Sequence, residues 1–108
     1  MKTDWSKKEF LAYVLLYAAH CNHFETKEEE NFILSLVDKK TFHKIHTEVV
    51  VDSDEDNLNK IQYYLNDNKF NQQEKEALLR DIKNVFFADG SVDVIEKKVF
   101  AILKKIIG

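Results

Sequence analysis

The chain has 108 residues with a formal net charge of −3 at pH 7, no proline, two glycines and one cysteine. This length predicts a single domain, residues 1–108, that folds without a metal or disulfide, and the scarcity of turn-forming residues favours an all-α protein over a sheet protein. The negative charge argues against a general nucleic-acid binder, and no apolar run is long enough for membrane insertion, so we expect a cytoplasmic protein that requires no cofactor.

The first predicted helix begins after Ser6, which pairs with Glu9 three residues later as a capping box. Its apolar face is wide enough to place this helix at the centre of the core. The residues of that face are Phe10, Leu11, Val14, Leu15, Tyr17, Ala18 and Cys21. The helix is expected to end within residues 19–23. A second helix should follow Thr26, with Glu29 as its capping partner.

The middle of the chain carries weaker helical patterns. Phe42, Ile45 and Val49 have the spacing of a modest helix after Thr41. Residues 49–51 are three consecutive valines, so a short extended piece is the alternative there. Ser53 is placed to begin a fourth helix, and the capping pair of Asn71 and Glu74 opens a fifth.

The last part of the chain predicts two helices joined by a turn. An apolar stripe precedes the turn and a second one follows it: Leu78, Leu79, Ile82, Val85 and Phe86, then Val99, Phe100, Leu103, Ile106 and Ile107. Gly90 is expected at positive φ, which ends the fifth helix at Ala88 or Asp89. Asp93 with Glu96 forms the capping box of the sixth helix.

The two ends of the chain share one plan. In residues 14–37 and 79–103 an apolar helix is followed by a short turn, a cap and a second apolar helix. We therefore predict a compact bundle of about six helices built from two pseudo-repeated helical hairpins that pack face to face.

The second of these hairpins also carries a short motif. Ala88-Asp89-Gly90 is followed after one residue by Val92-Asp93, after two more by Glu96, and then by an apolar helix. This pattern resembles the tellurite-resistance TerB-like family, whose all-helical domain also occurs at the head of a membrane-anchored co-chaperone. The resemblance covers nearly the whole chain. It implies a helical module with a role in stress resistance.

The resemblance also implies candidate metal ligands. In the family an Asp-Gly turn is common in both halves, and its acidic residues are candidate ligands; Asp89, Asp93 and Glu96 match these positions. The first half departs from the pattern, with Cys21-Asn22 or His20-Cys21 where Asp-Gly is expected. The departure argues against a paired, two-loop acidic site.

The acidic residues of this turn have two interpretations. Asp93 and Glu96 have the spacing of a capping box, which needs no ligand. Together with Asp89 and Ser91 they could instead converge oxygen atoms on a divalent cation, although Val94 stands where an EF-hand loop needs glycine. Any calcium or magnesium binding at such a site should be weak.

A second candidate metal site combines nitrogen and sulfur ligands. His20, Cys21 and His23 cluster near the end of the first helix, and His43 and His46 are three residues apart on another. Such ligands suit zinc or copper if the two segments meet. The alternative is that Cys21 is a buried structural thiol on the apolar stripe.

No catalytic signature accompanies these residues. A hydrolase built on Cys21 would need an orienting partner and an oxyanion loop, and the sequence suggests neither. The lysines of the last helix, Lys97, Lys98, Lys104 and Lys105, are expected to form a solvated face. We therefore expect a non-enzymatic interaction module with a protein partner; the alternative is a metal-ion binding or sensing protein.

Overall fold

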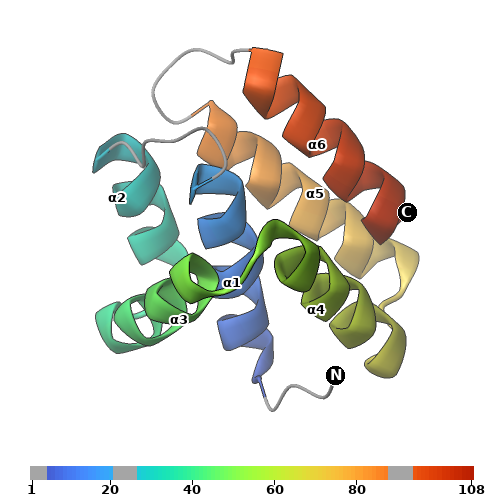
Figure 1. The fold of residues 1–108 in the computed structure, drawn as a ribbon, viewed down its shortest axis with the longest axis horizontal. Coiled ribbons are helices and arrows are strands. Elements are labelled where there is room, and N and C mark those ends of the chain that lie inside the picture. The colour runs from blue at the N-terminus through green and yellow to red at the C-terminus, as the bar shows by residue number, and fades with distance from the viewer. Residues whose placement is uncertain (1–4, 21–26, 88–93) are drawn as a thin grey trace.

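A computed structural model describes residues 5–20, 27–87 and 94–108. These residues form six helices and no strand, which confirms the predicted all-α class (Figure 1). The helices are α1 (Lys7–His20), α2 (Lys27–Leu36), α3 (Lys39–Val51), α4 (Asp54–Asp67), α5 (Gln72–Phe86) and α6 (Val94–Ile107). No helix in the described part of the chain is long and apolar enough to cross a membrane.

Several helix starts lie where the sequence predicts them. The Ser6 amide donates to Glu9 Oε1 at 2.9 Å, and the Glu9 amide donates to Ser6 Oγ at 3.1 Å, so the capping box of α1 is complete. Asn71 and Glu74 form the same reciprocal pair at the start of α5. Ser53 caps α4 by accepting a hydrogen bond from the Asp56 amide.

The predicted start of α3 is wrong. Its N-cap is Asp38, which accepts a hydrogen bond from the Thr41 amide, and the Thr41 hydroxyl donates to the other carboxylate oxygen at 2.6 Å. A charged acceptor aligned with the helix dipole displaces the hydroxyl as the cap, so the helix begins earlier than expected. Helical structure then continues through Val51, which excludes the extended alternative for the three valines.

The predicted end of α5, at Ala88 or Asp89, is also wrong. The helix ends at Phe86, and Phe87 is its C-cap, because the Phe87 amide still donates to the Lys83 carbonyl at 3.0 Å. The positive φ of Gly90 and the cap at Asp93 fall outside the described residues, as does the cap at Thr26. Those three predictions stay predictions.

The core is organised around α1, as its apolar width predicts. Nine of its 14 residues are buried, including Leu15 and Leu16, which are fully enclosed. It packs most extensively against α3 and α5, and it also contacts α2, α4 and α6. Helix α1 therefore lies inside a shell made by the other helices (Figure 1).

Two helical hairpins are visible in the arrangement of these elements. Helices α5 and α6 run side by side along one flank of the molecule, α1 contacts α2, and α1 packs along α5 (Figure 1). The first turns of α2 and α6 lie toward the same end of the molecule. The face-to-face packing of two pseudo-repeated hairpins stays a prediction.

Candidate functional site

A groove lies between α5 and α6 and has a volume of about 280 Å³. Four of its lining residues come from one face of α5 and two from α6. They are Glu76, Leu79, Arg80 and Lys83, then Phe100 and Lys104. The spacing on α5 is three and four residues, so these side chains project from the same face of the helix. We call this feature the α5–α6 groove.

The floor of the α5–α6 groove is apolar and its rim is cationic. Leu79 and Phe100 are half-buried, whereas Arg80, Lys83 and Lys104 are exposed. The Lys83 ammonium lies 5.5 Å from the centroid of the Phe100 ring, within range of a cation–π interaction. With three cations and a single carboxylate, the groove favours an anionic ligand that also carries an apolar group.

A smaller hollow of about 200 Å³ lies between the start of α1 and α5. An ion pair between Lys7 and Glu74, 3.1 Å long, bridges its two helices. Burial raises the pKa of Asp81, which lies in the lining, and the Arg80 charge opposes that rise only in part. Its charges are therefore mixed, and the hollow has no net preference for an anion.

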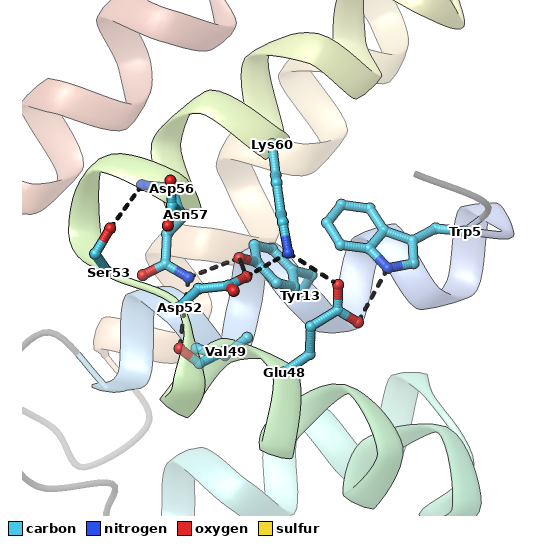
Figure 2. A network of polar contacts seen from close by, with 9 residues as sticks. All are labelled: Trp5, Tyr13, Glu48, Val49, Asp52, Ser53, Asp56, Asn57 and Lys60. Carbon is cyan, nitrogen blue, oxygen red and sulfur yellow. Dashed lines mark hydrogen bonds and ion pairs between the residues drawn. The ribbon is translucent and has the colours of Figure 1, made fainter. Parts of the chain in front are cut away.

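A polar network joins α1, α3 and α4 (Figure 2). The fully buried Tyr13 donates its hydroxyl to Asp52 Oδ2 at 2.6 Å and accepts a hydrogen bond from Asn57 at 2.7 Å. Lys60 reaches the same Asp52 oxygen at 2.6 Å and Glu48 at 3.4 Å. Because these residues come from three helices, the network fixes the joint between α3 and α4 onto α1.

The network sets the protonation states of its members. Burial raises the pKa of the Asp52 carboxyl, but the hydrogen bonds from Lys60 and Tyr13 outweigh burial and hold it below its ordinary value. Burial lowers the pKa of Lys60, and its contacts with Asp52 and Glu48 raise it above normal. Burial and the bond to Asp52 both raise the pKa of Tyr13. All three groups therefore keep their ordinary charges at neutral pH.

Trp5 closes one side of this network. Its indole N–H donates to Glu48 Oε2 at 3.3 Å, and its ring centroid lies 4.4 Å from that of Tyr13. The residues of the network satisfy one another, and Lys60 is enclosed by two carboxylates and the Tyr13 ring. We therefore interpret the network as a set of contacts that stabilises the fold rather than as a ligand site.

The predicted acidic metal site is described only in part. Asp89 and Asp93 lie outside the described residues, whereas Glu96 lies in the first turn of α6 and is 3% exposed. Glu29, in the first turn of α2, is fully buried. A carboxylate in this position is stabilised by the N-terminal end of a helix, which accounts in part for its burial.

The predicted histidine and cysteine cluster is likewise incomplete. His20 is exposed at the end of α1, and Cys21 and His23 lie outside the described residues. On α3, His43 and His46 both pack against Phe42, with ring centroids 5.5 and 5.8 Å away. In the described ranges, 5–20, 27–87 and 94–108, no three His, Cys, Asp or Glu side chains gather as metal ligands.

Comparisons of the chain with protein-family models, with curated proteins and with solved structures found no match.

Sequence reasoning missed the α5–α6 groove and the polar network. Lys104 was assigned with its neighbours to a solvated face, yet it borders the groove. No pattern in α5 alone distinguishes Arg80 and Lys83 from ordinary surface residues. The network did leave one signal, since Asn57 is buried on the face of α4 that also carries the buried Ile61 and Tyr64. A buried polar side chain on an apolar face indicates a hydrogen-bonding partner.

Proposed function

We propose that this protein is a non-enzymatic helical module of the TerB-like kind that binds a segment of a protein partner in the α5–α6 groove. The observation that carries the proposal is the combination of an apolar floor, Leu79 and Phe100, with three surrounding cations. Binding sites for peptide segments commonly combine an apolar pocket for one anchor side chain with charged groups that set orientation.

The chemistry of the groove defines the partner segment. An aliphatic or aromatic side chain would enter between Leu79 and Phe100, and acidic groups beside it would meet Arg80, Lys83 and Lys104. The described residues that line the groove include no cysteine, serine or histidine, so binding rather than covalent catalysis suits it. A link to stress resistance extends the proposal on the resemblance alone, and a cytoplasmic location extends it on the lack of a long apolar run in the sequence.

The proposal is tested by selecting ligands from a random peptide display library with the whole chain. We expect selected peptides to carry an apolar residue flanked by Asp or Glu. Lys83→Glu should raise the dissociation constant of such a peptide at least tenfold, about 1.4 kcal/mol, because it places like charges together. Calorimetric titration measures the change.

A matched control separates the effect of charge in the groove on peptide binding from the effect of the protein's net charge. Lys98→Glu makes the same change on an exposed residue of α6 that points away from the groove face of the helix, and it should alter the dissociation constant less than about twofold. Equal losses in the two variants would contradict the proposal. A selection that yields no peptide, or peptides without acidic residues, would contradict it as well.

A second candidate function is the binding of a divalent cation at the predicted acidic site before α6. The observation that bears on it is that Glu96, one of the three predicted ligands, is only 3% exposed in the first turn of α6. The described Glu96 would then act with Asp89 and Asp93, whose positions lie outside the described residues.

A thermal-shift series on chelator-treated protein tests this second candidate. A bound ion should raise the melting temperature saturably, with about 2.7 kcal/mol of stabilisation at one hundred times the dissociation constant. Glu96→Gln should abolish the ion-dependent shift in melting temperature. Glu28→Gln makes the same change at an exposed residue of α2 and should retain that shift. No shift with millimolar calcium, magnesium, manganese or zinc would exclude the site.

A further inference from the structure

The joint between α3 and α4 presents a surface that complements the α5–α6 groove. At the end of α3, Val50 is 48% exposed and Val51 is 78% exposed, the highest value among the exposed large hydrophobic side chains of the described residues. The first turn of α4 follows at once with three exposed acidic residues, Asp54, Glu55 and Asp56. We call residues 50–56 the α3–α4 corner.

The α3–α4 corner is held in one conformation. Asp52, between the valines and the acidic turn, is bound by both Tyr13 and Lys60, and Ser53 caps α4. Figure 2 shows Asp52 bonded to Tyr13 and Lys60, and Ser53 bonded to Asp56. A surface that is already ordered loses less conformational entropy on binding, so the α3–α4 corner can contribute to affinity.

We propose that the α3–α4 corner of one copy of this protein docks in the α5–α6 groove of a second copy. Val50 and Val51 would cover the apolar floor of Leu79 and Phe100. The acidic turn would meet the cations Arg80, Lys83 and Lys104. This inference rests on the proposed function of the groove, and it names the chain itself as a source of the acidic, apolar segment that the groove accepts.

The two surfaces lie on different parts of the chain, so two copies close as a two-fold dimer where each corner reaches the other's groove at once, and otherwise associate head-to-tail into a ring or a longer array. The attraction depends on opposite charges at an exposed rim, so it should weaken as added salt screens them.

Analytical ultracentrifugation of the whole chain tests the inference across micromolar to millimolar concentrations. We expect the average mass to rise above that of a monomer at low salt and to fall as salt is added. Lys83→Glu with Lys104→Glu should leave monomers, and so should Asp54→Lys with Glu55→Lys. A chain with all four substitutions should associate again, because both charge patterns are reversed.

Two controls keep these outcomes specific. Lys98→Glu with Lys105→Glu changes the net charge as much as the groove variant does, on exposed residues outside the groove, and should still associate. Circular dichroism should show every variant folded. A wild-type chain that stays monomeric throughout would overturn the inference, as would association that survives both surface variants or fails to return in the fourfold variant. If a monomeric chain still binds selected acidic peptides, the proposed function stands without this inference.

Discussion

Leu15→Ala should lower the free energy of unfolding by about 2–5 kcal/mol. Leu15 is 0% exposed on α1, the helix that contacts all five others. Truncation removes buried methyl groups and leaves a cavity that rigid neighbours on several helices cannot fill. Urea denaturation followed by circular dichroism measures the change.

The same substitution at the surface provides the control. Leu34 on α2 is 38% exposed, so Leu34→Ala removes much less buried area and should cost under about 1 kcal/mol. If Leu15→Ala proved as mild as Leu34→Ala, the placement of α1 at the centre of the core would be wrong.

Tyr13→Phe should destabilise the protein by about 1–3 kcal/mol. The substitution keeps the ring and removes only the hydroxyl, which donates to Asp52 and accepts from Asn57. The buried Asn57 amide then loses its shorter hydrogen bond and keeps only a 3.5 Å contact with the Val49 carbonyl. Equilibrium unfolding of both proteins in urea gives the difference.

Tyr64→Phe is the matched control for that experiment. Tyr64 is also buried, at 4% exposure, and stacks on Phe10 at 4.1 Å, but its hydroxyl makes no hydrogen bond within the described residues. Its loss should change stability by less than about 0.5 kcal/mol. Equal effects at the two tyrosines would show that the network contributes nothing beyond ring packing.

The sequence allowed the helices to be predicted because their starts are local features. A capping box joins residues three apart, so Ser6 with Glu9 and Asn71 with Glu74 could be identified without any knowledge of the fold. The start of α3 was missed because two candidate caps, three residues apart, compete. Asp38 and Thr41 are themselves hydrogen-bonded, and only the geometry shows which one caps the helix.

The groove could not be predicted, because it depends on which faces of two helices meet. The spacing of Leu79 and Lys83 is equally compatible with a helix face that is fully exposed to solvent. Only the packing of α6 beside α5 brings Phe100 and Lys104 next to them. The network poses the same problem, since Tyr13 and Asp52 are 39 residues apart in the chain.

The most direct test of groove binding is an NMR titration of isotope-labelled protein with a selected acidic peptide. We predict the largest chemical-shift changes at the amides of residues 76–83 and 100–104, saturating with a single dissociation constant that rises at least tenfold in Lys83→Glu. Changes centred on the hollow beside Lys7 and Asp81, or spread without saturation over the surface, would contradict the proposal that the α5–α6 groove is the binding site.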